Sequence, residues 1–125
     1  MNTSDIFVLA VVFLVIDSIF LYLMSGRFKS MVLAIQGEQL SMKIIPTIAC
    51  YIFLIFSLYY FIVSPRASHY SAFLLGLCIY GVFETTSLAI FQKWDLTTAL
   101  VDTVWGGILF ASTYHIWGRI VGDPA

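Results

Sequence analysis

Four long apolar segments dominate the pattern of hydrophobic and polar positions, and short polar stretches separate them. Each segment holds about the 20 apolar residues that a helix needs to cross the hydrocarbon core of a bilayer. Because lipid offers the backbone no hydrogen-bond partner, such segments cross a membrane as helices. The predicted spans cover residues 6–24, 44–63, 70–91 and 96–120. The pattern therefore predicts an all-α membrane protein, a bundle of four transmembrane helices.

The polar stretches carry signals that begin and end helices. Thr3-Ser4-Asp5 precedes the first span with side chains suited to a helix N-cap. Pro46 falls in the first turn of the second span, where its missing N–H costs little, and Ser64-Pro65-Arg66 ends that span. An even number of spans places both termini on the same side of the membrane.

The segment between the first two spans has an amphipathic pattern. We expect the first span to end near Ser25-Gly26, and the apolar positions that follow have i, i+3, i+4, i+7 spacing. These positions are Phe28, Met31, Val32 and Ile35. The pattern predicts a short interfacial helix within Arg27–Lys43, closed by Gly37 and lying on the lipid headgroups.

The amino-acid composition supports a membrane location and excludes a soluble protein and a nucleic-acid-binding protein. Of the 125 residues, 61% are hydrophobic and 10% are charged, and the mean hydropathy is +0.97. A soluble domain of this length could not cover so much apolar surface. The net charge of -1 excludes a basic footprint, so nucleic acid is not an expected partner. No linker or low-complexity tract marks a boundary, which predicts a single integral membrane domain over residues 1–125.

The connections between spans carry unequal numbers of basic residues. One face, which we call face B, is flanked by Arg27, Lys29, Lys43 and Lys93, and the opposite face, face A, by Arg66 and Arg119. Cytoplasmic connections carry the excess of Lys and Arg in membrane proteins. The sequence therefore predicts that both termini lie at face A, on the non-cytoplasmic side.

Three carboxylates interrupt the apolar spans, at Asp17, Glu84 and Asp102. Each is about seven residues from the face B end of its predicted helix. At a rise of 1.5 Å per residue, all three are expected about 10 Å below that face. A carboxylate within a membrane helix costs a few kcal/mol or more unless it is neutralised or partnered. An intramembrane acid is therefore a functional-site hypothesis by default.

No Lys, Arg or His is expected at that depth, so ion pairing does not explain the acids. Either they are mostly protonated or they hold a cation. Three interpretations stay open: interhelical hydrogen bonding that stabilises the bundle, a proton or cation pathway, and a membrane-embedded catalytic or metal site.

The predicted neighbours of the acids are hydroxyl-bearing and aromatic residues on adjacent turns. They are Tyr51, Thr85, Thr86, Ser87 and Trp105. An aromatic wall beside acids can hold an organic cation by cation–π attraction, although side-chain packing explains it equally. Small residues at Gly76, Gly81 and Gly106-Gly107 allow helices to approach closely.

Other candidate chemistry is sparse. His69 and His115 both come near face A and can ligate a metal, but their aromatic neighbours favour an aromatic belt at the membrane surface. The motifs of ordinary hydrolases and nucleotide enzymes are missing from the sequence. No catalytic residue is predicted, and any cofactor or metal stays unassigned.

At the same acids the chain resembles a family of small membrane proteins known as domain of unknown function 2177. Asp17 and Phe20 resemble its first motif, a helix-1 Asp followed by an aromatic residue. The stretch from Phe83 to Ala89 with Trp94 resembles its second motif, Tyr-Asp-x-Thr-Asn-x-Ala followed by a Trp, with Phe, Glu and Ser in place of Tyr, Asp and Asn. Asp102-Thr103-Val104-Trp105-Gly106 resembles the third, Asp-x-x-Trp-Gly. The resemblance implies a four-helix membrane protein and no established activity.

These features together predict a polytopic protein of the lipid bilayer in which Asp17, Glu84 and Asp102 bind or relay protons or small cations. It would act as a channel or transporter, within a homo-oligomer because one thin bundle leaves little room for a pathway. The alternatives are a structural or accessory subunit of a larger membrane complex, and a membrane-embedded enzyme that acts on lipids.

Overall fold

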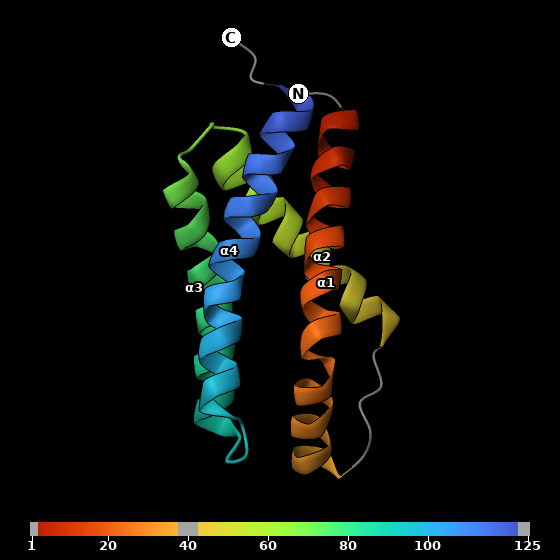
Figure 1. Cartoon of the computed structure of the whole chain (residues 1–125), viewed down its shortest axis with the longest axis vertical. Helices are drawn as coiled ribbons and strands as arrows, with labels where there is room; N and C mark the ends of the chain where they lie inside the picture. Colours follow the sequence, from red (N-terminus) through yellow and green to blue (C-terminus); the bar gives the residue numbers. More distant parts are fainter. Residues whose placement is uncertain (1–2, 38–42, 123–125) are drawn as a thin grey trace.

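Four long helices make up the part of the chain that the structure describes, residues 3–37 and 43–122 of a computed structural model (Figure 1). They are α1 (Thr3–Gln36), α2 (Ile44–Leu58), α3 (His69–Ile90) and α4 (Leu96–Val121), and a π-helical turn, η1 (Tyr59–Val63), continues α2. Each helix, α2 with its extension, is long and apolar enough to cross a membrane. The predicted all-α architecture with four membrane-length helices is therefore confirmed.

The first helix is longer than predicted. α1 runs without a break through Ser25-Gly26 to Gln36, 34 residues or about 50 Å at 1.5 Å per residue. The prediction of a separate interfacial helix is therefore corrected, because residues 27–36 belong to α1. Residues 38–42 of that predicted segment lie outside the described residues. Gly37 follows the helix with a φ of 73°, in the left-handed region that favours glycine at a helix C-terminus.

Neither residue at the expected break stops the helix. The Ser25 hydroxyl donates to the carbonyl of Tyr22, so it bonds within the helix. Gly26 costs a helix only about 1 kcal/mol relative to alanine. Packing offsets this cost, because Phe28 lies edge-on to Phe20 with ring centroids 6.5 Å apart. The residues before and after Gly26 therefore form one continuous helix.

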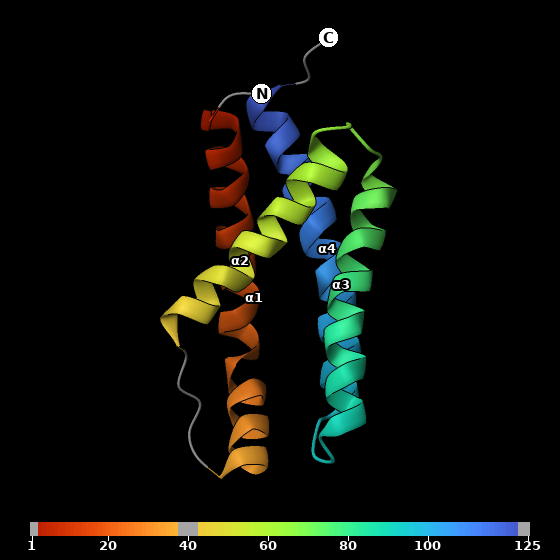
Figure 2. The ribbon, with the colours of Figure 1, turned by 180° about the vertical axis from the view of Figure 1, so that it is seen from behind.

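The backbones of α3 and α4 touch in an antiparallel hairpin, and the two helices lie side by side in both views (Figures 1 and 2). Gly76 of α3 lies against Gly106 of α4, and a Cβ at Gly76 would overlap with the carbonyl group of Gly106. A Cβ at Gly107 would come within 2.7 Å of the Phe73 ring. Larger residues would force the helices apart, because interiors this closely packed have no room to spare.

The other two helices pack differently against this hairpin. α1 runs along α4, and α2 crosses α1 obliquely toward the start of α3 (Figure 2). The Trp117 indole N–H donates to the backbone carbonyl of Asp5 at 2.9 Å. The start of α1 and the end of α4 therefore lie at one end of the molecule, which is face A because Arg66 and Arg119 are also there.

The apolar core occupies the half of the molecule nearest face A. Its buried members are Leu9, Phe13, Leu54, Leu58, Ile62, Val63, Ala72, Leu109, Phe110 and Trp117. Large apolar side chains also cover the outside, and Tyr22 and Ile45 are both 81% exposed. The lipid of a bilayer can cover such an apolar surface, whereas its exposure to water would be unfavourable. The buried acids Glu84 and Asp102 lie in the other half, toward face B, and the buried Asp17 lies where the two halves meet.

We predict that Gly76→Ala destabilises the hairpin, because the new methyl group meets backbone that cannot rotate away. Overpacking of this kind costs about 1–3 kcal/mol. Gly81→Ala is the matched control on the same helix, since its Cβ would make an ordinary contact of 3.5 Å with the Thr103 methyl group. Thermal unfolding in detergent, followed by circular dichroism, compares the two variants. Equal midpoints would contradict the close contact.

Candidate functional site

Both carboxylate oxygens of Asp17 are hydrogen-bonded, although only 4% of the residue is exposed. The Tyr51 hydroxyl of α2 donates to Oδ2 at 2.6 Å. The Trp105 indole N–H of α4 donates to Oδ1 at 3.0 Å, and the ring stacks on Phe20 with centroids 4.5 Å apart. Asp17 therefore joins α1 to α2 and α4, with no oxygen left without a donor.

Glu84 differs from Asp17, because only one of its oxygens has a donor. The residue is 1% exposed, and Oε2 accepts the Trp94 indole N–H at 3.0 Å. Oε1 is buried, and no donor among the described residues reaches it. The neighbouring group is the carboxyl of Asp102 on α4, which is within hydrogen-bonding reach. Two carboxylates only accept, so this contact becomes a hydrogen bond when one of the two groups holds a proton.

The acids lie at two depths. Asp95, the N-cap of α4, pairs with Arg27 of α1, so these two residues mark one level near face B. Asp102 follows Asp95 by seven residues, about 10 Å along α4. Asp17 precedes Arg27 by ten residues, about 15 Å along α1. The predicted single depth is therefore corrected for Asp17, which lies level with Trp105, because α1 does not end where the sequence suggested.

Tyr80 connects the two levels. It precedes Glu84 by four residues, so both side chains leave the same face of α3. It lies close enough to both Asp17 and Asp102 for their charges to act on its phenol. Our sequence-based prediction did not include Tyr80, and its i, i+4 spacing from Glu84 is the signal that identifies it. Trp94 was also not among the predicted lining residues, because its contact with Glu84 depends on how the α3–α4 loop folds back.

The three predicted hydroxyl residues of α3 are placed differently. Ser87 is buried, with 5% exposed, one turn after Glu84. Thr85 and Thr86 are exposed, because the helix turns them away from the face that carries Glu84. The Thr85 hydroxyl donates within α3 to the Gly81 carbonyl at 2.6 Å. Thr85 and Thr86, which we expected beside the acids, therefore lie on a different face of α3 from Glu84.

We use the name acid cluster for Asp17, Glu84 and Asp102 with Tyr51, Tyr80, Trp94 and Trp105. None of its three carboxyl groups forms an ion pair with a described residue. The described residues also contain no group of three or more His, Cys, Asp or Glu side chains that could hold a metal ion. The two histidines lie elsewhere, near face A, with ring centroids 5.4 Å apart. The chemistry of the cluster is thus that of buried carboxyl groups with indole and phenol donors.

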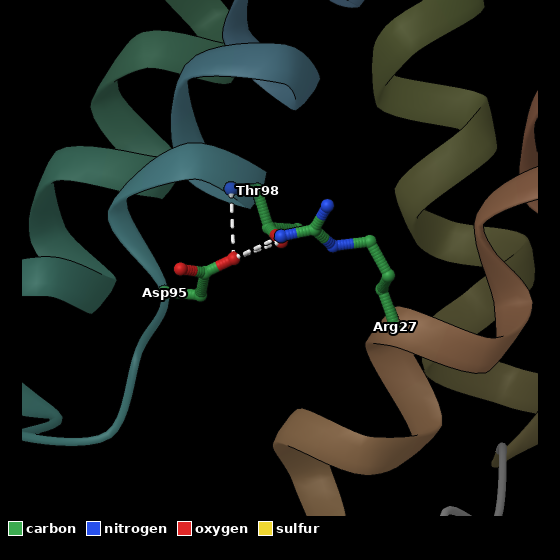
Figure 3. Close-up of polar contacts among 3 residues, drawn as sticks. All are labelled: Arg27, Asp95 and Thr98. Atoms are coloured by element: carbon green, nitrogen blue, oxygen red, sulfur yellow. Dashed lines mark hydrogen bonds and ion pairs between the residues drawn. The ribbon is translucent and has the colours of Figure 1, made fainter.

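An ion pair bridges the groove between α1 and α4 near face B (Figure 3). Arg27 Nη2 lies 2.6 Å from Asp95 Oδ2. The same oxygen accepts the Thr98 hydroxyl at 2.6 Å and the Thr98 backbone N–H at 3.1 Å. These donors lower the pKa of Asp95 to about 2, and the Thr98 hydroxyl contributes most, followed by Arg27. The groove has a volume of about 690 Å³, and Lys93 and Met31 also line it.

We predict that Tyr51→Phe lowers the free energy of unfolding by about 1–3 kcal/mol, because it leaves Asp17 Oδ2 buried without its donor. Tyr60→Phe, which removes the hydroxyl of an exposed tyrosine on the same span, is the matched control and should change stability by less than about 0.5 kcal/mol. Reversible unfolding in mixed micelles measures both. If the two variants lose the same free energy of unfolding, the hydrogen bond from Tyr51 to Asp17 does not stabilise the fold.

We predict that the ionised carboxylate of Asp95 contributes to stability and that this contribution is lost in acid. Its pKa in the folded protein, about 2, lies below the ordinary value of about 3.9, so its carboxylate stabilises the fold above about pH 4. That contribution is lost as the pH falls toward 2. Asp95→Asn keeps a capping side chain but removes the charge, so it should be less stable at pH 7 and lose less on acidification. Thermal midpoints in detergent between pH 7 and pH 2 provide the comparison, and parallel curves for the two proteins would contradict it.

Comparison with known proteins places these residues in a family. Residues 3–118 match the family described as predicted membrane protein, DUF2177, and this range contains the whole acid cluster. No curated protein and no solved structure matches the chain significantly. The match covers far more than half of the sequence and agrees with the four membrane-length helices. The chain therefore belongs to the DUF2177 family of predicted membrane proteins.

Proposed function

We propose that Glu84 and Asp102 form the reversible proton-binding site of a proton or small-cation transporter or channel, and that Asp17 completes it. The observation that carries the proposal is the buried Oε1 of Glu84, which has no donor among the described residues and lies next to the carboxyl of Asp102. A shared proton supplies the missing hydrogen bond and relieves the repulsion between two neighbouring carboxylates. A small cation between them has the same effect.

The position of the pair favours exchange with the solution at face B. Glu84 is bonded to Trp94 of the α3–α4 loop, and Asp102 is only two turns into α4 from that loop. Toward face A, in contrast, the cluster borders the apolar core, where Leu9, Phe13 and Leu109 are completely buried. A proton that enters from face B would therefore reach the carboxyl groups of the pair without crossing the apolar core.

The same asymmetry supports a homo-oligomer. Within one chain the polar groups of the cluster end at Asp17 and Tyr51, and the described residues beyond them are mainly apolar. A path to face A would then run between chains. Native mass spectrometry of the protein in detergent tests this part of the proposal, which requires species larger than one chain of 14.1 kDa.

A specific observation also favours the structural alternative for Asp17. Both of its oxygens have donors from other helices, so it stabilises the packing of α1 against α2 and α4 whether or not ions move. A structural or accessory subunit of a membrane complex would need only acids of this kind. Glu84 and Asp102 distinguish the two proposed functions, because Oε1 of Glu84 has no donor among the residues that the structure describes.

The test is proton and monovalent-cation flux into liposomes that contain the purified full-length protein. We predict flux above that of empty liposomes for the wild type, and loss of this excess for Glu84→Gln and Asp102→Asn, because an amide cannot give up and take back a proton at neutral pH. Thr86→Val is the matched control, since Thr86 lies on α3 near Glu84 but is exposed. It should conduct like the wild type.

Thermal midpoints of all variants separate loss of function from loss of folding. The transport proposal is supported if Glu84→Gln and Asp102→Asn lose flux and keep the wild-type midpoint. It is overturned if the wild type shows no flux under a gradient of either direction, or if the two variants conduct like Thr86→Val. Lower midpoints in the absence of any wild-type flux would instead favour the structural alternative.

A further inference from the structure

Asp17 lies deeper in the molecule than the pair formed by Glu84 and Asp102, and among the described residues no hydrogen bond joins it to them. It is level with Trp105, which follows Asp102 by three residues, about 4.5 Å along α4. Asp102 is within hydrogen-bonding reach of Glu84, whereas Asp17 acts on it through charge alone. A proton bound by the pair therefore needs an intermediate group to reach Asp17.

The side chain of Tyr80 on α3 is packed between these two levels. Its ring lies on the bare backbone of Gly106, where a Cβ would overlap with the ring. Gly106 directly follows Trp105, whose indole N–H donates to Asp17, and it is four residues after Asp102. The ring is therefore anchored one residue from a donor to Asp17 and one helical turn from Asp102.

The phenol of Tyr80 is close to both acids, because the charges of Asp17 and Asp102 both act on it. No hydrogen bond to another described residue holds its hydroxyl, so the O–H can turn toward either carboxyl group. Tyr51 is different, since its hydroxyl already donates to Oδ2 of Asp17 at 2.6 Å. The described titratable groups of other helices around the Tyr80 phenol are Asp17 of α1, Cys50 and Tyr51 of α2, and Asp102 of α4.

The hydrogen-bond donors around the acids favour a proton over a metal cation. The Trp105 indole and the Tyr51 hydroxyl donate to the two oxygens of Asp17. The Trp94 indole donates to Oε2 of Glu84. A cation that sheds its water needs several oxygen atoms around it, whereas these donors present positively polarised hydrogens. A proton needs one free lone pair, and a carboxylate has about four acceptor sites.

We propose that the Tyr80 hydroxyl relays protons between the pair and Asp17, so that the site carries protons and not metal cations. In the relay step the carboxyl O–H of Asp102 gives its proton to the phenol oxygen, while the phenol O–H gives its own proton to a carboxylate oxygen of Asp17. Asp102 becomes a carboxylate, Asp17 becomes a carboxyl group and Tyr80 stays neutral. The relay rests on the proposed function, because it takes its proton from the pair.

The first measurement is ion flux into liposomes that contain the full-length protein. Tyr80→Phe keeps the ring on Gly106 but removes the hydroxyl, so proton flux should fall about tenfold or more, since a positioned proton-transfer group contributes at least that much. Tyr70→Phe is the matched control and should conduct like the wild type, because Tyr70 lies on the same helix and is 70% exposed. Sodium and potassium flux should equal that of empty liposomes.

Time-resolved infrared spectroscopy after an acid jump gives a second readout that does not depend on transport. The C=O band of a protonated carboxyl group reports each acid, and the bands lost in Asp17→Asn and Asp102→Asn assign the two. In Tyr80→Phe the Asp102 band should appear at the wild-type rate, whereas the Asp17 band should appear about tenfold more slowly. Equal slowing of both bands would overturn the relay, because it indicates lost packing.

The two measurements separate failure of the relay from failure of the proposed transport. The relay is overturned if Tyr80→Phe, with a wild-type thermal midpoint, protonates Asp17 at the wild-type rate or conducts protons like Tyr70→Phe. It is also overturned if the wild type carries sodium or potassium and Glu84→Gln does not. If the wild type conducts nothing but Tyr80→Phe still delays the Asp17 band alone, the relay stands and the transport proposal fails.

Discussion

The contact between the bare backbones of Gly76 and Gly106 is the constraint on which the acid cluster depends. Two turns along α3 from this contact is Glu84, and about one turn back along α4 is Asp102. Because the helices are antiparallel and touch, their registers bring the two carboxyl groups together. A wider separation would part the buried Oε1 of Glu84 from the carboxyl of Asp102, and a polar group isolated in this way costs several kcal/mol in lipid.

The second consequence of this packing is a division of the molecule into two halves. Toward face A, Leu9, Phe13 and Phe110 pack in an apolar core, and toward face B the buried side chains include carboxyl groups that accept hydrogen bonds from indoles and a phenol. Asp17 lies where the two halves meet, and its hydrogen bonds hold α1 and α2 to the hairpin.

The basic side chains are kept at the two ends, where water and headgroups can solvate them. Near face B, Arg27 pairs with Asp95 and thereby extends the contact between α1 and α4 beyond the acid cluster. Near face A, Arg66 and Arg119 gather around a cavity lined by no acidic residue among those described.

The sequence by itself determined the four spans and the three acids, because hydropathy and the cost of charge in lipid are local properties of a segment. It did not determine the length of α1, since a single glycine such as Gly26 stops a helix only when packing does not oppose it. The sequence also did not show that Ser87 is buried whereas Thr85 is exposed, because the burial of hydroxyl groups on one turn depends on where the facing helix packs. For the same reason it did not identify Tyr80 as a neighbour of the acids. Only the tertiary structure decided which oxygens of the acids have donors, because that depends on the register in which the helix faces meet.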